Sequence, residues 1–335
     1  MRAIGVDLHK TMFMVCYLTG ETKEFRQYKI NEVQRFAEGL RPDDLLALET
    51  TGNTRYFVSQ VKDRVREVVI INPVEFKIIS KSVKKTDKKD AELIAFYLQK
   101  EMLPKVRMKD ELTYQIKSLA NTRDKLVKLR TILKNKLHNI MNAHGIVTKR
   151  EEYSSEKGLK RILEAPINQV AKIEVEIIVE QIRHLNEGII KIEKEMKERG
   201  SQLKGFENLT SIKGIGEKSA TILLSIIGDI NDFESDKKLS AYFGLVPRIS
   251  QSNETIHYGR ITKRGSKLGR TTLVQCSLIA KKYSPYIEKY FNRIKEKKGS
   301  GKAIIATARK LLGIIYMTLK EDLIYEDFPN FVLKS

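Results

Sequence analysis

The sequence is poor in cysteine and lacks long apolar segments. Its 335 residues include only two cysteines, Cys16 and Cys276, too few for a disulfide framework or a cysteine-based metal cluster. No uninterrupted apolar run approaches the about 18 residues of a membrane-spanning helix, which excludes an integral membrane protein. At the N-terminus, Asp7 and His9 interrupt the chain before a signal-peptide core could form. We therefore expect a cytoplasmic protein with no membrane partner.

Positive charge is what the sequence has in excess. Lys and Arg number 62 against 42 Asp and Glu, which gives a net charge of +20. The excess is concentrated, with 12 basic and 4 acidic residues in 101–150 and 13 basic and 2 acidic residues in 255–302. Such placed charge favours a polyanion partner, nucleic acid first and an anionic membrane surface second. A hydrophobic content of 41% is enough for buried cores, and the length predicts about two domains.

The first hundred residues predict an α/β fold with a mixed sheet. Three β-rich runs without an intervening helix predict an antiparallel meander. Two further buried strands alternate with helical segments, which indicates parallel pairing. The predicted order is β-β-β-α-β-α-β-α, with strands at 4–6, 12–18, 25–30, 45–48 and 68–71 and helices at 31–40 and 54–65.

The middle of the chain predicts long helices with a coiled-coil pattern. Apolar residues recur at alternating spacings of four and three, which is typical of coiled coils. Arg123 and Arg130 occupy two positions of the first seam. The helices could pair within the chain, across 152–166, or between chains, as a structural or dimerisation arm. The two seams comprise Leu112, Ile116, Leu119, Leu126, Leu133, Leu137 and Ile140, and Ile178, Ile182, Leu185, Ile189, Ile192 and Met196.

The last third, from about Phe206, is predicted to be mainly helical. Residues 209–220, with Gly214 and Gly216, have the form of a helix-hairpin-helix. Backbone N–H groups at the start of the second helix could bind a phosphate, with Lys213 and Lys218 beside them. An ordinary glycine-rich helix–helix turn explains the same pattern. A polar stretch at 247–269 interrupts the helices.

Four carboxylates are candidates for a metal centre. Asp7 and Glu49 follow two strands that should be neighbours, and Asp87 and Asp90 share one helix face. Carboxylates converging at a sheet edge suit Mg²⁺, and a pair of such ions can act on a phosphodiester. Glu92 is near in sequence but lies off that face. The surrounding lysines, which could steer a nucleic-acid backbone, are Lys81, Lys84, Lys85, Lys88 and Lys89.

Several motifs in order carry a family resemblance. The sequence resembles the DEDD transposases of insertion sequences, the bridge-RNA-guided recombinases that also include the pilin-gene inverting recombinases. The resemblance covers nearly the whole chain and falls on GVDLHK at 5–10, ETTG at 49–52, KTDKKDA at 85–91, LTSIKGIG at 209–216, GLVPR at 244–248, Gln251 and Ser252, GRITKRG at 259–265 and ARKLL at 308–312.

This resemblance implies a fold and a domain division. It implies an RNase H-like N-terminal domain, similar to Holliday-junction resolvases, over 1–105. A helical coiled-coil arm would follow over 106–204, and a C-terminal transposase domain over 205–335. The family's four acidic positions match Asp7, Glu49, Asp87 and Asp90. They would hold Mg²⁺ as metal ligands and catalytic residues.

The resemblance also implies a second catalytic group. The family uses a serine nucleophile that forms a seryl–DNA phosphodiester, and its motif position is Ser252. Ser250 stays open as an alternative, and His257 is a lesser candidate for backbone contact. A serine needs a base or metal to activate it. The residues expected to bind nucleic acid, and to stabilise charge on phosphorus where they lie near the serine, are Arg248, Arg260, Lys263, Arg264, Lys213, Lys218 and Lys88.

We therefore expect a DNA recombinase of an insertion element, working on the element ends and target in double-stranded DNA. The family adds a guide RNA and a homodimer or homotetramer. Two alternatives stay open. A Mg²⁺-dependent junction-resolvase-type endonuclease would use water as its nucleophile and form no covalent adduct. A non-catalytic nucleic-acid-binding protein would not need the four acids.

Overall fold

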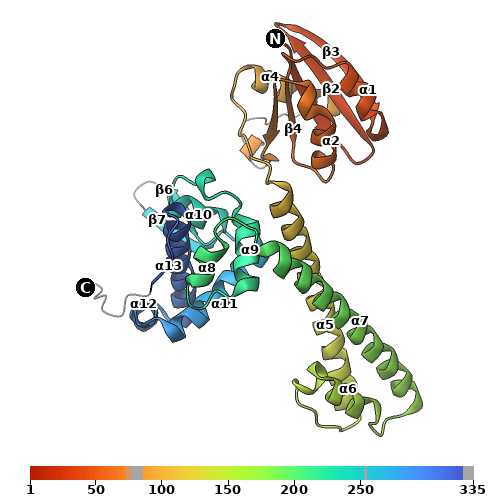
Figure 1. Cartoon of the computed structure of the whole chain (residues 1–335), viewed down its shortest axis with the longest axis vertical. Coiled ribbons are helices and arrows are strands. Elements are labelled where there is room, and N and C mark those ends of the chain that lie inside the picture. The colour runs from red at the N-terminus through yellow and green to blue at the C-terminus, as the bar shows by residue number, and fades with distance from the viewer. Residues whose placement is uncertain (74, 77–85, 253–254, 327–335) are drawn as a thin grey trace. The chain divides into compact units, whose positions relative to one another are not determined.

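The structure is a computed structural model that describes residues 1–73, 75–76, 86–252 and 255–326, with only the backbone of residue 252. The chain forms two compact units, Met1–Met108 and Lys109–Ser335. The path of the chain through both is drawn in Figure 1. Within the described residues, no helix is both long and apolar enough to cross a membrane.

The first unit is built on a five-stranded mixed sheet. Its strand order is β3-β2-β1-β4-β5, with β1–β2 and β2–β3 antiparallel and β1–β4 and β4–β5 parallel. The predicted meander, parallel pairing and element order are therefore confirmed. The strands are β1 (Ala3–Leu8), β2 (Met12–Thr19), β3 (Thr22–Lys29), β4 (Leu45–Glu49) and β5 (Glu67–Ile71).

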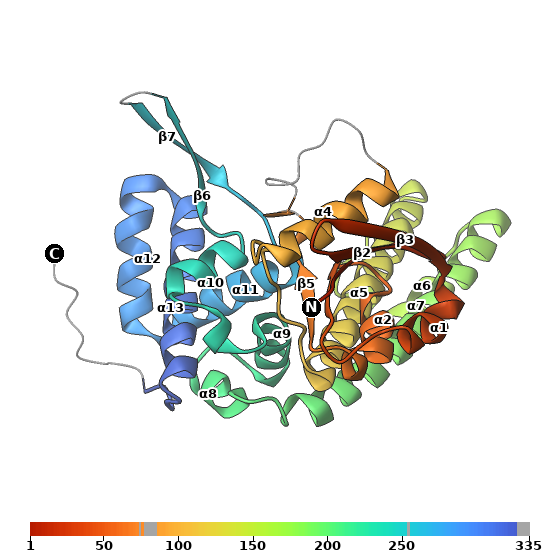
Figure 2. The same ribbon diagram turned by 90° about the horizontal axis from the view of Figure 1, so that it is seen from above.

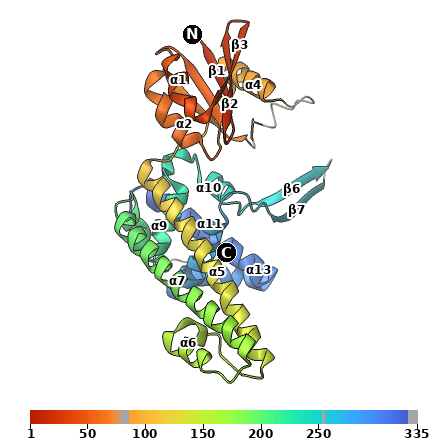
Figure 3. The ribbon, with the colours of Figure 1, turned by 90° about the vertical axis from the view of Figure 1, so that its right-hand side faces the viewer.

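Helices cover both faces of this sheet, as the side view in Figure 3 shows. Helices α1 (Val33–Glu38) and α2 (Thr54–Val61) bury Phe36 and Phe57 against one face. Helix α4 (Asp87–Gln99) buries Ala91, Ile94 and Ala95 against the other. Short 3-10 turns precede α1 and follow α2, at Ile30–Glu32 and Lys62–Arg64. Because strand residues alternate between the two buried clusters, the sheet is the middle of three layers.

The second unit begins with a pair of antiparallel helices, α5 (Glu111–Ala143) and α7 (Gln169–Gly200). Figure 3 shows them side by side. Their direction follows from cross-helix contacts, because Arg123 binds Glu193 at 2.5 Å and Arg130 binds Asn186 at 2.7 Å. The two seam arginines thus have polar partners between the helices. Turn η3 (Glu152–Ser154) and helix α6 (Glu156–Leu163) close the far end of the pair.

The remaining helices surround a large apolar cluster. Leu223, Phe243, Leu273 and Leu311 are fully buried in it. The elements are α8 (Phe206–Ser211), α9 (Glu217–Ile227), η4 (Ile230–Asp232), α10 (Asp236–Tyr242), α11 (Lys267–Tyr283), α12 (Pro285–Lys298) and α13 (Ser300–Lys320). The prediction of a mainly helical last third is confirmed.

The polar stretch 247–269 contains structure that the sequence analysis missed. Residues expected only to interrupt the helices form an antiparallel pair, β6 (Pro247–Ser252) and β7 (Thr255–Ile261). The available signal was Ile256 and Tyr258 at alternate positions of one strand, with Ile249 opposite Tyr258 in the other. Their polar neighbours concealed it, because neither face of the pair is buried.

The chain enters the second unit at a half-buried lysine. Lys109 donates hydrogen bonds from Nζ to the carbonyl oxygens of Ser225, at 2.8 Å, and Ile226. These carbonyls lie at the end of α9, where a helix has unsatisfied acceptors. Burial, aided by the charge of Lys117 and opposed by Asp110 and Asp232, lowers the pKa of Lys109 to about 7.

Candidate active site and nucleic-acid interface

Asp7 and Glu49 lie beside each other at one edge of the sheet. Val6 of β1 pairs with Leu48 of β4 in parallel register, so the next residues, Asp7 and Glu49, are neighbours. Val6 and Leu48 both belong to the cluster under α1 and α2. Because strand residues alternate, Asp7 and Glu49 belong to the opposite face, which α4 covers. Adjacent strands are about 4.8 Å apart, so the register brings the two acids into one site.

Helix α4 brings the other two acids to this edge because it packs directly on Gly5. A methyl group at Gly5 would lie 2.1 Å from the carbonyl oxygen of Ala91 and 2.4 Å from the nitrogen of Ala95. The absent side chain therefore lets the helix backbone reach the strand. Asp87 lies one turn before Ala91 and Asp90 lies in the same first turn. The close contact thus sets how near these acids come to Asp7.

The N-terminus of α4 is fixed by its own cap. The Thr86 hydroxyl accepts a hydrogen bond from the Lys89 backbone N–H at 3.2 Å. This contact satisfies a free donor at the helix start and defines where α4 begins. Acidic residues in a first turn are favoured by the helix dipole. The local sequence therefore stabilises the very turn that presents Asp87 and Asp90.

His9 belongs to this cluster and was missed as a site residue. Its Nε2 lies 3.1 Å from Asp7 Oδ2 and 3.5 Å from Asp87 Oδ1. One possible ligand atom from each of Asp7, His9 and Asp87 lies within 4.8 Å of the others. Its position two residues after Asp7, just past the strand end, was the available signal. Only the packing of α4 shows that both aspartates meet the imidazole.

The electrostatics of the cluster suit a bound cation. Burial raises the pKa of Asp7 above its ordinary value, and the nearby charges of Asp87 and Asp90 raise it further, while His9 opposes them. A divalent cation would neutralise this repulsion and favour the ionised carboxylates. Carboxylate oxygens are the ligands that hard divalent cations prefer, and imidazole suits transition metals. The donor set therefore fits a divalent metal.

Asn53 holds the turn that carries His9. Its side-chain nitrogen donates to the carbonyl oxygens of His9 at 3.0 Å and Lys10 at 2.9 Å. Asn53 follows the Glu49-Thr50-Thr51-Gly52 motif and precedes α2. These bonds tie the β1–β2 turn to the segment after Glu49. Sequence reasoning missed this positioning residue, since its partners are backbone atoms about 40 residues away.

The other charged candidates near α4 have different surroundings. Glu92 binds Lys23 at 2.7 Å and Lys89 at 3.2 Å, and the hydrogen bond from Lys23 lowers its pKa. It is therefore in a surface ion-pair network, away from the cluster of Asp7, His9 and Asp87. Lys88 is exposed in the first turn of α4. The candidate lysines Lys81, Lys84 and Lys85 lie outside the described residues.

The serine candidates lie on the β6–β7 pair in the second unit. The backbone of Ser252 ends β6 and pairs with Thr255. Ser250 pairs with His257, and both side chains are exposed. Asn253, the residue that follows Ser252, lies outside the described residues.

The basic candidates of this region gather along the β pair and its exit. Arg248, Arg260, Lys263 and Arg264 are all exposed. Gly244 packs at the base, where a methyl group would lie 2.2 Å from the Arg264 carbonyl oxygen. This contact brings the two ends of the β pair together. The arrangement presents several cations on one protruding element, which suits binding along a phosphate backbone.

Lys213 and Lys218 belong to the other segment predicted to bind nucleic acid. Lys213 lies between α8 and α9, and Lys218 lies in the first turn of α9. Both are exposed, and Gly214 between them has a positive φ of 103°. Lys218 binds Glu193 of α7 at 3.1 Å, so part of its charge is already compensated. Gly216 caps α9 without a side-chain hydrogen bond, as expected for a helix N-terminus built from backbone N–H groups.

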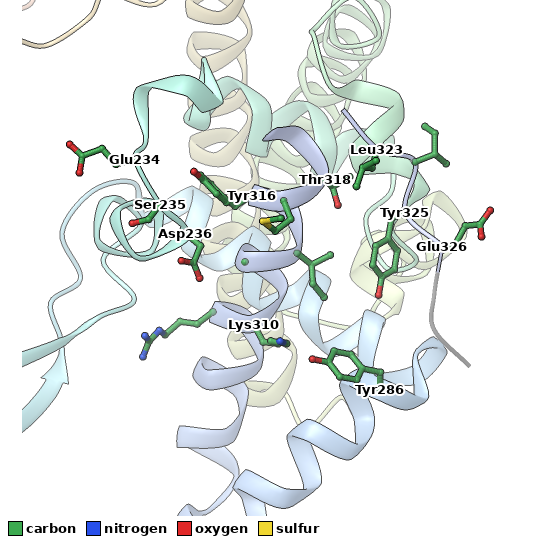
Figure 4. A pocket seen from close by; sticks show the side chains of 15 residues that line it. Glu234, Ser235, Asp236, Tyr286, Lys310, Tyr316, Thr318, Leu323, Tyr325 and Glu326 are labelled. Atoms are coloured by element: carbon green, nitrogen blue, oxygen red, sulfur yellow. The ribbon is translucent and has the colours of Figure 1, made fainter. Parts of the chain in front are cut away.

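The second unit also contains a cavity of about 720 Å³, which is lined by residues other than the candidates above (Figure 4). Tyr286, Lys310, Tyr316 and Tyr325 line it together with acidic Asp236. None of the residues predicted to act on DNA lines this cavity. The candidate residues instead lie at a sheet edge and on an exposed β pair, which suits a polymeric substrate better than an enclosed small molecule.

Comparison with known proteins identifies the family. A DEDD transposase model of the IS110 type matches residues 4–146, and the model described as transposase IS116/IS110/IS902 family matches residues 206–292. The pilin gene-inverting protein of Moraxella lacunata is 30% identical, covering 95% of this chain and 96% of that protein. The chain belongs to the IS110 family of transposases. The IS1111A transposase of Coxiella burnetii is 25% identical, covering 95% of this chain and 90% of that protein.

Because it belongs to this family, the protein is a DNA transposase and recombinase. The family model with the DEDD signature spans the whole sheet and α4, and its fold is consistent with an RNase H-like domain. A divalent metal is typical of such transposases, and the cluster around Asp7 fits one. The resemblance stated from the motifs is therefore confirmed.

Proposed function

We propose that this transposase cuts and rejoins DNA through a covalent seryl–DNA intermediate, with Ser252 as nucleophile and Asp7, Glu49, Asp87 and Asp90 as ligands of Mg²⁺. The observation that carries the metal part is the convergence of acids at one sheet edge. Strand register makes Asp7 the neighbour of Glu49, and helix α4 adds Asp87 within reach of the same imidazole. The serine part rests on the motif position of Ser252.

The chemistry balances without an external energy source. The Ser252 hydroxyl attacks phosphorus, forming an Oγ–P bond while one P–O bond to deoxyribose breaks. The serine proton leaves to a base, and the departing deoxyribose oxygen takes up a proton. A hydroxyl of another strand then attacks the same phosphorus and releases the serine. The number of phosphodiester bonds is unchanged, so ATP is not required.

This chain's own residues would hold and neutralise the phosphate. Arg248, Arg260, Lys263 and Arg264, all exposed, would stabilise negative charge that develops on the phosphoryl oxygens. Mg²⁺ bound at the acidic cluster would supply a Lewis acid for phosphoryl oxygens. His9 would keep the Asp7 and Asp87 carboxylates oriented. Lys88, Lys213 and Lys218 would bind further phosphates of the nucleic-acid backbone.

The proposal extends to partners and organisation. Family membership supports a guide RNA that supplies sequence specificity, while the concentrated basic segments bind backbone. It also supports a homodimer or homotetramer, since two DNA duplexes must be held together. We propose three functional parts, the RNase H-like domain 1–105, a coiled-coil arm 106–204 built on α5 and α7, and the transposase domain 205–335. The α8–α9 segment is its helix-hairpin-helix-like element.

The test is a search for protein–DNA adducts that survive denaturation, in cells that carry the element with its native flanks. Wild type is expected to form an adduct that Ser252→Ala abolishes. Ser250→Ala is the matched control, since it also removes a serine hydroxyl from β6, two residues before Ser252. Asp7→Ala is expected to abolish the adduct, and Glu92→Gln, outside the cluster, to retain it.

Other outcomes would contradict the proposal. Loss of the adduct in Ser250→Ala but not in Ser252→Ala would move the nucleophile to Ser250. Nicking without any adduct, still dependent on Asp7, would indicate a junction-resolvase-type endonuclease that uses water. Normal recombination by Asp7→Ala would show that the acidic cluster has no catalytic role.

A further inference from the structure

The β6–β7 pair stands apart from the helices of its own unit. Figures 2 and 3 show both strands extending away from α10 and α11. Every described side chain from Arg248 to Gln251 and from Thr255 to Arg260 is exposed. A two-stranded pair without a covering layer is only marginally stable in water. Its conformation is therefore suited to a partner that covers it.

The two faces of the pair differ in chemistry. Ile249 pairs with Tyr258 and Gln251 with Ile256, and residues opposite each other in an antiparallel pair share a face. Ile249, Ile256 and Tyr258 therefore form an apolar face, and they are 62%, 47% and 70% exposed. The other face carries Ser250 and His257. An apolar group that is solvated on a protruding element marks an interaction surface.

Charge identifies the partner of the apolar face. The described residues of the β pair include Arg248 and Arg260 and no acidic residue, and Lys263 and Arg264 follow directly. A polyanion is therefore attracted to the same element that exposes the apolar face. Phosphates would be bound by the basic side chains, whereas apolar and aromatic side chains pack best against the faces of the bases. Both needs are met together by a nucleic acid, and DNA is favoured over RNA because Ser252, the proposed nucleophile for DNA, ends the same strand.

We propose that the apolar face inserts against the bases of the DNA beside the phosphate that is cleaved, and unstacks them there. Tyr258 and Ile256 would contact bases while Arg248 and Arg260 hold the flanking backbone. The inference rests on the proposed function in one respect, that Ser252 ends the same strand and needs a phosphate held near it. A register shift between Pro247 and Ile249 disturbs the pair at its base. Such irregularities increase local twist and can redirect a strand end.

Photo-cross-linking tests the contact independently of the serine chemistry. p-Benzoylphenylalanine would replace Tyr258, or Tyr283 of α11 as a control of similar exposure, 61%. Full-length protein that also carries Ser252→Ala would be bound to DNA of the native element ends and irradiated. We expect position 258 to cross-link to DNA at least about tenfold more than position 283. Cross-linking to a second copy of the chain, or none above position 283, would overturn the inference.

Permanganate reactivity of thymines tests the unstacking. Wild type is expected to increase reactivity beside the cleavage position, and Ile256→Ser and Tyr258→Ser to reduce this increase about tenfold, in line with the worth of base stacking. Ile279→Ser and Tyr283→Ser, exposed on α11, are expected to stay within twofold of wild type. Equal permanganate patterns for all variants would contradict insertion.

The two proposals fail in different ways. Should Ser252→Ala still form the covalent adduct, the nucleophile would be wrong, while cross-linking from position 258 would still report the base contact. Should Tyr258→Ser form normal amounts of adduct, the insertion would be wrong and Ser252 unaffected. Because the Ile256 and Tyr258 side chains are exposed, the variants should unfold at the wild-type temperature, which separates loss of contact from loss of fold.

Discussion

Replacing Gly5 with alanine is expected to displace helix α4 and disable the acidic cluster. The new methyl group would lie 2.1 Å from the Ala91 carbonyl oxygen and 2.4 Å from the Ala95 nitrogen. Both are backbone atoms within a helix, so no flexible side chain can move aside. Normal contacts require the helix to retreat by about 1 Å, which is typical of overpacked cores. Asp87 and Asp90 would move away from Asp7 with it.

The cost follows from the size of the overlap. Overpacking by a methyl group typically costs about 1–3 kcal/mol of the free energy of unfolding. For a domain of about 100 residues, this lowers the melting temperature by about 5–20 °C. The catalytic loss should be larger than the stability loss, because a displacement of about 1 Å is enough to cost about 100-fold in rate.

Thermal unfolding and adduct formation would be measured on the full chain. Gly39→Ala is the matched control, since its methyl group would meet only the Phe36 carbonyl oxygen, at an ordinary 3.5 Å. It should leave the melting temperature within about 2 °C of wild type and adduct formation within twofold. A Gly5→Ala variant that behaves like Gly39→Ala would refute the argument that this contact sets the position of α4.

Three further variants test other parts of the structure. Asp7→Asn should abolish DNA cleavage, yet its melting temperature in EDTA should be no lower than that of wild type. Burial and neighbouring charges raise the pKa of Asp7, so its ionised form destabilises the fold as pH rises through that pKa. Mg²⁺ should raise the melting temperature of wild type but not of this variant. Burial lowers the pKa of Lys109 from 10.5 to about 7, so the free energy of unfolding of the second unit should rise with pH between these two values, by up to about 1.4 kcal/mol for each step of one in pH. Urea titrations at several pH values would measure this slope, and Lys109→Met should remove it. Gly244→Val should cut adduct formation at least about tenfold, since Gly244 has a φ of +66° and a side chain would meet the Arg264 backbone at 2.2 Å, whereas Gly301→Ala, with open space around it, should change nothing.

Much of the sheet could be predicted because its signals are local. Alternating and continuous apolar runs gave the five strands, and a helix between two strands requires parallel pairing. The position of Glu49 beside Asp7 followed from that pairing alone. The β6–β7 pair was missed because both of its faces are exposed, so the burial that makes strands recognisable in a sequence is absent.

The residues of the acidic cluster could be predicted only in part from the sequence. Asp7, Glu49, Asp87 and Asp90 were predicted as metal ligands from strand ends, helical spacing and a family resemblance, and their role stays a prediction. His9 and Asn53 were not, because their roles depend on contacts with α4 and with distant backbone carbonyls. A histidine after a strand has no distinguishing pattern until the helix that faces it is in place.

By itself the sequence determined the order of elements in the first hundred residues, the concentration of positive charge and the neighbouring positions of Asp7 and Glu49, since each depends on residue type and spacing along the chain. Only the tertiary structure decided that α4 touches β1 at Gly5, that His9 joins Asp7 and Asp87, and that β6 and β7 expose one apolar face. Those features depend on distances between segments far apart in sequence. Such distances are set by packing of whole elements, which no local pattern encodes.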